Sequence, residues 1–286
     1  MAIYERVAVL GFGTMGGGIA QVVAQSGREV WVLENEQSRI DAGRTAVEKF
    51  LISGIERGKI TPEQSEEILG RIHGTTSVSD LSGVDLVIEA VTERREVKAA
   101  LFVEVAAVVP ETTVLATNTS ALSVSDLATS VPHPERFAGL HFFNPAQLMK
   151  VVEVVRGLAT SAEVNENLIA FVGDIGKNAV PVKDRPGFLV NKLLMPYLND
   201  VIQEFDDELA SAEDIDVAIR LGLGYKVGPF ELLDLIGLDV HEHATRSAYN
   251  ATLDPVFAPP PLLQTMVAAG RLGNKSGRGF RTEASK

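Results

Sequence analysis

The sequence predicts an α/β fold in which a doubly wound, mostly parallel β-sheet is followed by an all-helical C-terminal domain. The first two-thirds of the 286 residues alternate short β-rich runs with helical stretches. A glycine-rich turn between Gly11 and Gly16 follows the first run and opens a helix. The β-rich pattern ends near Asp184, after which only helical periodicity remains. We therefore expect one domain over residues 1–184 and a second over residues 185–286.

Short apolar and β-branched runs mark the expected strands, and longer amphipathic stretches mark the helices. The strands are expected at residues 6–10, 29–33, 84–90, 113–117, 136–142, 151–155 and 179–182. Helices are expected at residues 15–26, 36–58, 188–209, 212–221, 228–236 and 261–270. Thr61 and Pro62 form a suitable N-cap and first-turn pair for a further helix, and Ser211 with Asp214 forms another cap.

Composition and charge exclude several classes of function. Hydrophobic residues make up 45% of the chain and charged residues 22%, which is typical of a globular protein. A net charge of −12 disfavours nucleic acid and anionic membranes as partners. The absence of cysteine excludes a disulfide scaffold, a thiolate nucleophile and a Cys-ligated zinc, and we expect no metal. With no signal pattern and no apolar run of about 20 residues, a cytoplasmic protein is expected.

The segment Gly11-Phe-Gly13-Thr14-Met15-Gly16 matches the dinucleotide fingerprint of a Rossmann-type domain. Gly11 permits a tight turn, Gly13 lets the backbone approach a pyrophosphate, and Gly16 allows close packing of helix on strand. The backbone N–H groups at Thr14 and Met15, where the expected helix starts, then face the phosphates. Glu34 closes the second expected strand, where a carboxylate binds ribose hydroxyls and repels a 2′-phosphate, so NAD is favoured over NADP. The alternative is an ordinary strand–turn–helix with Glu34 as a solvated turn residue.

Histidine is the side chain best suited to accept a hydroxyl proton when an alcohol is oxidised by a nicotinamide. Of the five histidines, His73 and His133 stand in loop-like contexts, and His241 and His243 fall on a helix of the second domain. His141 alone ends a predicted core strand, and the ends of parallel strands are where open α/β sheets bind ligands. The residues by themselves leave open that His141 is a hydrogen-bonded core histidine.

Several ordered motifs resemble those of the L-3-hydroxyacyl-CoA dehydrogenase family. The central one is Gly139-Leu-His141-Phe-Phe-Asn144-Pro145, followed by Met149-Lys-Val-Val-Glu153. Asn118-Thr-Ser120 precedes it, and Asp184-Arg-Pro-Gly-Phe-Leu-Val-Asn191 follows it. The segments 228–239 and 275–280 resemble the family's helical domain and its C-terminal end. The resemblance therefore covers nearly the whole chain, in order.

The resemblance implies NAD-dependent, reversible oxidation of L-3-hydroxyacyl-CoA to 3-oxoacyl-CoA, with hydride passing from C3 to NAD. His141 is then the general base, and Glu153 orients its imidazole. Ser120 and Asn191 hold the oxygens of the substrate. Taken singly, Ser120 also fits a helix cap, Asn191 a helix-surface amide and Glu153 a solvated strand acid.

The same resemblance implies further cofactor contacts from Glu93, Lys98, Ser120, Asn144 and Lys275. Lys98 has an ordinary alternative, because a lysine on a helix usually faces solvent. Lys275 belongs to the second domain, so it would reach the cofactor across an interdomain cleft.

An acyl-CoA substrate needs local positive charge on this acidic chain. Lys49 and Arg57 are the candidate CoA contacts, with Lys59 beside them, and surface salt bridges are the alternative. Phe50 stands where some family members have a CoA-binding serine. The C-terminal domain has more apolar helix face than it needs internally, which predicts a homodimer through this domain. Its apolar positions include Leu189, Val190, Leu193, Leu194, Met195 and Leu198.

Two other functions use the same fold. A dehydrogenase of free 3-hydroxy acids, such as L-gulonate, retains the glycine turn, His141 and Glu153 but needs no CoA channel. A non-catalytic protein related to lens crystallins retains the fold without the reaction. Intact Ser120, His141, Glu153 and Asn191 argue against this second alternative.

Overall fold

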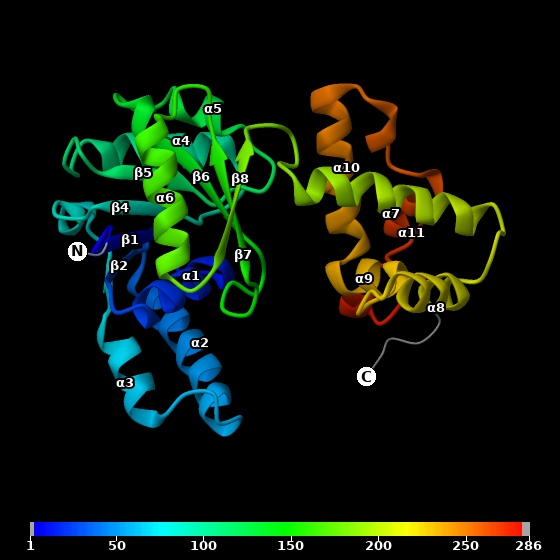
Figure 1. Cartoon of the computed structure of the whole chain (residues 1–286), viewed down its shortest axis with the longest axis horizontal. Coiled ribbons are helices and arrows are strands. Elements are labelled where there is room, and N and C mark those ends of the chain that lie inside the picture. The colour runs from blue at the N-terminus through cyan, green and yellow to red at the C-terminus, as the bar shows by residue number, and fades with distance from the viewer. Residues whose placement is uncertain (1–2, 282–286) are drawn as a thin grey trace. The chain divides into compact units, whose positions relative to one another are not determined.

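The computed structural model describes residues 3–281 and divides the chain into two compact units. The first unit ends at Arg185 and contains one β-sheet with helices on both faces, and the second begins at Pro186 and contains helices (Figure 1). The predicted fold class is confirmed. Within residues 3–281, none of the helices combines the length and apolar character needed to cross a bilayer.

The sheet of the first unit has eight strands in the order β3-β2-β1-β4-β5-β6-β7-β8 within the described residues. Neighbours from β3 to β6 pair in parallel, β6 and β7 are antiparallel, and β7 and β8 are parallel. From β1 the strand order runs outward through β2 to β3, and from β4 it runs outward in the opposite direction to β8. Because the connections on either side of β1 and β4 lead to opposite directions, a crevice opens at the carboxyl ends of these two strands. The strands are β1 Arg6–Leu10, β2 Glu29–Leu33, β3 Ile72–Thr75, β4 Leu86–Glu89, β5 Val114–Thr117, β6 Phe137–Phe142, β7 Val151–Arg156 and β8 Asn178–Lys183.

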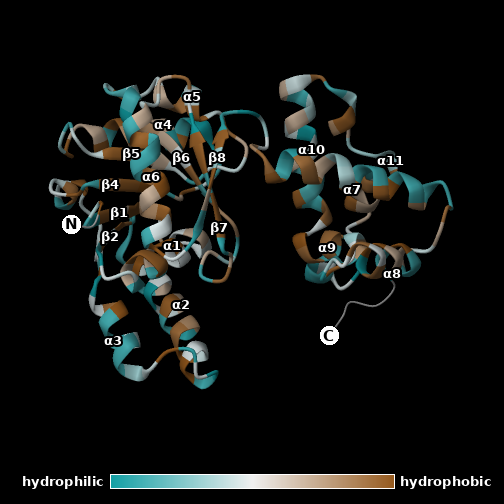
Figure 2. Ribbon diagram, in the orientation of Figure 1, coloured by the Kyte–Doolittle hydropathy of each residue, from teal (hydrophilic) through white to brown (hydrophobic). Residues whose placement is uncertain are grey.

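Alternate residues of each strand face the two helical layers that cover the sheet. Leu140 and Phe142 of β6 share one core cluster with residues of α1 and α6, whereas Phe137 packs edge-on against Phe102 of α4. Covered on both sides, β1 is hydrophobic from Val7 to Leu10 and β4 from Leu86 to Ile88 (Figure 2). The helices of this unit are α1 Thr14–Gln25, α2 Gln37–Glu56, α3 Pro62–Gly70, α4 Arg95–Ala106, α5 Val124–Ala128 and α6 Ala162–Asp174, with short 3-10 turns η1 Val78–Leu81 and η2 Pro134–Arg136.

Helix starts follow the predicted capping chemistry. The Thr61 hydroxyl accepts from the backbone N–H of Gln64, whose side chain accepts in return from the Thr61 N–H, so α3 begins with a complete capping box. The Ser211 hydroxyl likewise accepts from the N–H of Asp214 at the start of α8. Both predicted caps are confirmed.

His73 corrects one expectation. It lies in β3 rather than in a loop, and its Nε2 is 2.6 Å from Glu29 Oε2 on the neighbouring strand. β3 lies at the edge of the sheet, and among its four residues only Ile72 is buried. Such a strand carries no alternating apolar pattern, which is why the sequence did not predict it.

Two buried aspartates connect separate segments of the second unit through hydrogen bonds to backbone N–H groups. Asp216 on α8 accepts from the N–H groups of Phe230 and Glu231 at the start of α9. Asp234 accepts from the N–H groups of Phe280 and Arg281 near the end of the described chain. The N–H groups of Phe230 and Phe280 are buried, and these bonds satisfy donors that water cannot reach. The helices are α7 Val190–Asp206, α8 Ala212–Leu223, α9 Pro229–Ile236, α10 Leu238–Thr252 and α11 Pro261–Ala268, with η3 Pro255–Phe257 and η4 Asn274–Ser276.

Candidate active site

The glycine turn lies at the crevice between β1 and α1. Gly11 has φ +94°, a conformation that L side chains rarely adopt. A Cβ at Gly16 would overlap the carbonyl oxygen of Gly11, so only glycine allows the helix to approach the strand so closely. A Cβ at Gly13 would meet no protein atom within 4 Å, and Gly13 is exposed. The space above Gly13 therefore remains available for a ligand at the start of α1, beside the exposed Thr14.

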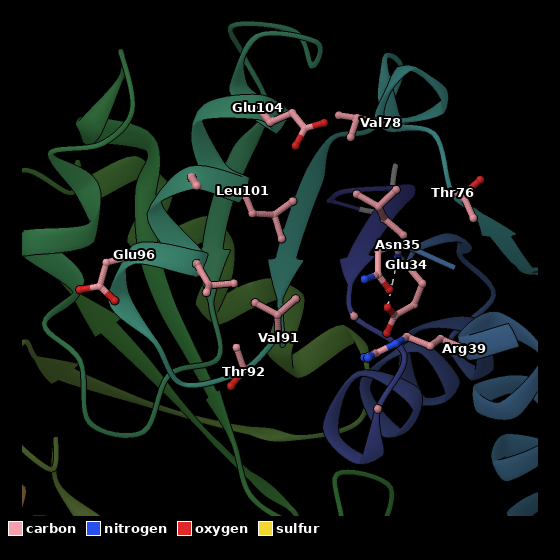
Figure 3. A pocket seen from close by; sticks show the side chains of 15 residues that line it. Glu34, Asn35, Arg39, Thr76, Val78, Val91, Thr92, Glu96, Leu101 and Glu104 are labelled. Carbon is pink, nitrogen blue, oxygen red and sulfur yellow. Dashed lines mark hydrogen bonds between the residues drawn. The ribbon is translucent and has the colours of Figure 1, made fainter. Parts of the chain in front are cut away.

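Glu34 borders the same crevice. Its Oε1 accepts from the backbone N–H of Phe12 at 2.7 Å, and Oε2 accepts from that of Asn35 at 3.3 Å. The carboxylate thus has a fixed position beside a cleft of about 960 Å³. Figure 3 shows Glu34 and Asn35 on one side of this cleft and Leu101 of α4 on the other. The turn, the clear space above Gly13 and the carboxylate fit a dinucleotide.

His141 and Glu153 face each other across the β6–β7 ladder. Leu140 and Phe142 face the core cluster that includes α1 and α6, so His141 between them faces the opposite side of the sheet. Glu153 is its register partner on β7, and Oε2 lies 2.6 Å from the imidazole Nδ1. Both side chains are buried, with exposed fractions of 8% and 0%. A carboxylate only accepts, so Nδ1 carries the proton and the lone pair of the neutral ring is on Nε2.

The predicted residues of the first unit come together around His141. A pocket of about 310 Å³ is lined by Met15, Ala90, Val91, Glu93, Lys98, Asn118, Ser120, His141, Phe142, Phe143 and Asn144. The Phe143 ring lies 4.5 Å from the imidazole, centroid to centroid. The Asn118 amide oxygen accepts from the N–H of Phe142 at 2.9 Å, which ties the end of β5 to the end of β6. We call this cavity the histidine pocket.

Lys98 is buried rather than solvent-facing, since its side chain is 1% exposed. Its ammonium lies 2.6 Å from Glu89 Oε1 and 3.1 Å from Glu93 Oε2. Burial opposes ionisation of Glu93, but Lys98 and hydrogen bonds from Thr119 and Ser120 outweigh it and hold the pKa of Glu93 below its ordinary value. Glu93 therefore remains charged at neutral pH at the edge of the histidine pocket.

Four further predicted contacts belong to the second unit or to the region of α2. Asn191 is the second residue of α7, and Lys275 in η4 pairs with Asp239, both within the second unit. Burial raises the pKa of Asp239, but Lys275 outweighs that effect and the pKa is lowered. Lys49 is exposed on α2, and Arg57 is exposed at its C-cap. The roles of these four side chains remain predictions.

Sequence reasoning assigned no role to Glu89, Thr117 or Thr119, which surround Lys98 and Glu93. One signal was available for the first of them. Glu89 is the charged last residue of the apolar strand LVIE, and a charge at a core position needs a buried partner. In the part of the chain that the structure describes, no group of three or more His, Asp or Glu side chains could hold a metal.

Two family models together match most of the chain. The NAD-binding domain of 3-hydroxyacyl-CoA dehydrogenase matches residues 6–185, and the C-terminal domain of the same enzyme matches residues 187–283. The first match confirms NAD as the cofactor for which the glycine turn is built.

Relatives and solved structures agree with these matches. The 3-hydroxybutyryl-CoA dehydrogenase of Mycobacterium tuberculosis H37Rv is 42% identical, over 97% of this chain and 98% of the relative. The 3-hydroxyadipyl-CoA dehydrogenase of Escherichia coli K12 is 45% identical over 96% of this chain, which spans only 58% of that longer protein. The crystal structure of (S)-3-hydroxybutyryl-CoA dehydrogenase PaaH1 from Ralstonia eutropha has a TM-score of 0.95 at 38% identity, covering 99% of this chain and 100% of that one. The ordered motifs, the fold and these matches show that the chain belongs to the 3-hydroxyacyl-CoA dehydrogenase family.

Proposed function

We propose that this protein oxidises L-3-hydroxyacyl-CoA to 3-oxoacyl-CoA with NAD, reversibly, using His141 as the general base. The observation that carries the proposal is the buried His141–Glu153 pair, in which His141 lines the histidine pocket beside the dinucleotide cleft. Val91 lines both cavities. The names of the relatives support a 3-hydroxyacyl thioester as the substrate.

His141 accepts the proton of the 3-hydroxyl on Nε2, because Nδ1 already donates to Glu153. The carboxylate of Glu153 fixes this tautomer and stabilises the imidazolium that forms. NAD, when bound, supplies the acceptor for the hydride that leaves C3. In the reverse direction the imidazolium returns its proton to the oxygen.

Further side chains position the reacting groups in this proposal. We assign to Ser120, and to Asn191 in the second unit, the task of holding substrate oxygens. Glu93, Lys98, Asn144 and Lys275 contact the cofactor in this proposal, together with the turn from Gly11 to Gly16 and Glu34. Lys49 and Arg57 supply the positive charge for CoA.

The experiment that tests the proposal measures NADH formation with L-3-hydroxyacyl-CoAs from C4 to C16. A dicarboxylic thioester belongs in the series because the E. coli relative is named for 3-hydroxyadipyl-CoA. Free 3-hydroxybutyrate and L-gulonate serve as controls. Turnover of thioesters with little turnover of free acids is the expected result, and preference for the free acids would assign the sister activity. A protein that binds NADH but oxidises none of these compounds would be non-catalytic.

We also propose a homodimer formed through the second unit. Of the apolar positions on α7, Met195 and Leu198 are buried within the unit, whereas Leu193 is 67% exposed. Leu221 and Leu223 at the end of α8 are 73% and 61% exposed, more apolar surface than a small helical unit usually leaves in water. Sedimentation equilibrium of the full chain and of Leu193→Glu checks this. A monomeric wild-type protein contradicts it.

The proposed compartment is the cytoplasm. A chain without cysteine suits a reducing environment. Fractionation of the source cells, followed by detection of the full chain, tests this assignment.

A further inference from the structure

Glu89 is a buried carboxylate that lies behind the histidine pocket rather than in its lining. It is the last residue of β4 and is 0% exposed. Oε1 accepts from the N–H of Val91 at 2.7 Å and from Lys98 Nζ at 2.6 Å, and Oε2 accepts from the Thr117 hydroxyl at 2.7 Å. Each of these three partners is a donor, which suits an ionised carboxylate because it can only accept.

The contacts continue from Lys98 towards the pocket. Lys98 Nζ reaches Glu93 Oε2 at 3.1 Å. Glu93 Oε1 accepts from the hydroxyl of Thr119 and from the N–H groups of Ser120, at 2.9 Å, and Ala121, at 3.2 Å. The Glu89–Lys98–Glu93 triad therefore connects the end of β4 and helix α4 with the segment that carries Ser120.

Burial differs along the triad, and this difference indicates which member is the anchor. Glu89 and Lys98 are 0% and 1% exposed, whereas Glu93 is 37% exposed. A buried ammonium needs a buried counter-charge, because water cannot replace it. Glu93 can exchange contacts with solvent, but Glu89 cannot. Lys98 is therefore held primarily by Glu89.

The placement of Glu89 follows from strand alternation. Leu86 and Ile88 of β4 belong to the core cluster that includes α1 and α6, so Glu89 faces the other side of the sheet. His141 faces that same side from β6, since its neighbours Leu140 and Phe142 face the core cluster. The triad and the catalytic pair thus share one face of the sheet at its carboxyl edge.

We propose that Glu89 is a positioning residue: it anchors Lys98, which holds Glu93, which in turn holds the segment from Thr119 to Ala121 so that Ser120 stays at the histidine pocket. This inference rests on the proposed function, in which Lys98, Glu93 and Ser120 contact cofactor or substrate. Glu89 itself touches neither and acts through Lys98.

The decisive variant is Glu89→Gln. The amide oxygen can accept from Val91 and Lys98 while the amide N–H donates to the Thr117 oxygen, so the shape is preserved, the charge is lost and the hydrogen bond with Thr117 is reversed. We expect kcat/KM to fall about 10- to 100-fold, because small misplacements of positioning groups have effects of this size. We expect the Kd for NADH, measured by fluorescence titration without substrate, to rise about 10-fold.

Thr117→Val is a milder second variant, which keeps the volume of the side chain and removes one donor from Glu89. We expect changes in the same direction of roughly threefold, in line with loss of one hydrogen bond. If Glu89→Gln does not fold, this variant still decides the question.

Asp174→Asn is the matched control. Asp174 pairs with the buried Arg28 at 3.0 Å, and neither residue lines the histidine pocket or the dinucleotide cleft. It should lower Tm and leave kcat/KM and the NADH Kd within twofold of wild type. The inference is overturned if Glu89→Gln and Thr117→Val change these two constants no more than the control does. A wild-type protein that oxidises no thioester would refute the proposed function instead, and the NADH titrations would still test the triad.

Discussion

Glu153 lies directly opposite His141 in the antiparallel ladder of β6 and β7, with 2.6 Å between the carboxylate Oε2 and the imidazole Nδ1. The chain reverses between these strands, and the register then places the two side chains on the same face. With both buried, the hydrogen bond between them is shielded from water and holds the ring in one tautomer.

Replacing Glu153 with Gln should disturb the orientation of the His141 imidazole without changing the binding of the cofactor. A glutamine can turn its N–H toward Nδ1 and favour the wrong tautomer, so kcat should fall by about 10²–10⁴-fold, as it should for His141→Ala. The NADH Kd should stay within twofold in both variants. Glu166→Gln, on the exposed surface of α6, is the control for steady-state kinetics. Wild-type kcat in either His141→Ala or Glu153→Gln would refute the base assignment.

Two glycines of the turn should respond differently to a single methyl group. Gly13→Ala meets no protein atom, so Tm should be unchanged while the KM for NAD rises about 10-fold or more. Gly16→Ala collides with the Gly11 carbonyl and should lower Tm as well as NAD affinity. Thermal unfolding and NAD kinetics of both proteins test the difference. Equal losses of Tm would mean that Gly13 is needed for packing and not for the cofactor.

Loss of the Glu34 carboxylate should weaken binding of NAD and relax discrimination against NADP. Glu34→Ala removes the group proposed to bind the ribose hydroxyls and to repel a 2′-phosphate. We expect the KM for NAD to rise about 10-fold, the ratio of kcat/KM for NAD over NADP to fall, and kcat at saturating NAD to stay near wild type. An unchanged KM for NAD would rule out the ribose contact.

His241 should make the second unit sensitive to acid. Burial lowers its pKa from 6.5 to about 4, and its Nε2 lies 3.0 Å from the amide oxygen of Asn199. The unfolded chain therefore takes up a proton below pH 6.5 that the folded chain takes up only near pH 4, so stability is lost as pH falls through this window. Between pH 7 and pH 5 this amounts to about 2 kcal/mol.

Urea unfolding followed by circular dichroism measures this effect. The free energy of unfolding of wild type should fall between pH 7 and pH 5 by about 2 kcal/mol more than that of His241→Gln. All other titrating groups are shared by the two proteins, so their contributions cancel in the comparison. Equal pH dependence in both would show that His241 is protonated in the folded state already at pH 5.

The local pattern of the sequence predicted most helices and strands, because the spacing of apolar residues and the capping residues depend on the backbone conformation of the same segment. Apolar strands such as 29–33 and caps such as Thr61 appear where they were expected. The exception, β3, is an edge strand whose hydrogen bonds to β2 hold it without an apolar repeat. Its pairing partner, and not its own composition, makes it a strand.

The contacts within the candidate site could be predicted less completely from local sequence patterns. Residues such as His141 and Ser120 stand in recognisable motifs. Glu89 lies in an apolar strand, and its role depends on its hydrogen bond with Lys98, nine positions further on. Lys98 in turn looks like a surface lysine of a helix until its two carboxylate partners are known. Charge pairs of this kind depend on which strands and helices meet.

The sequence by itself determined the alternation of strands and helices, the glycine turn and the family motifs. The spacing of apolar residues and the missing Cβ of glycine influence the backbone only within a few residues, so they can be recognised locally. The tertiary structure decided which side chains touch, including His141 with Glu153 and Glu89 with Lys98. Those contacts join different elements, so they exist only once strand order and register have been set by burial of the sheet between its helices.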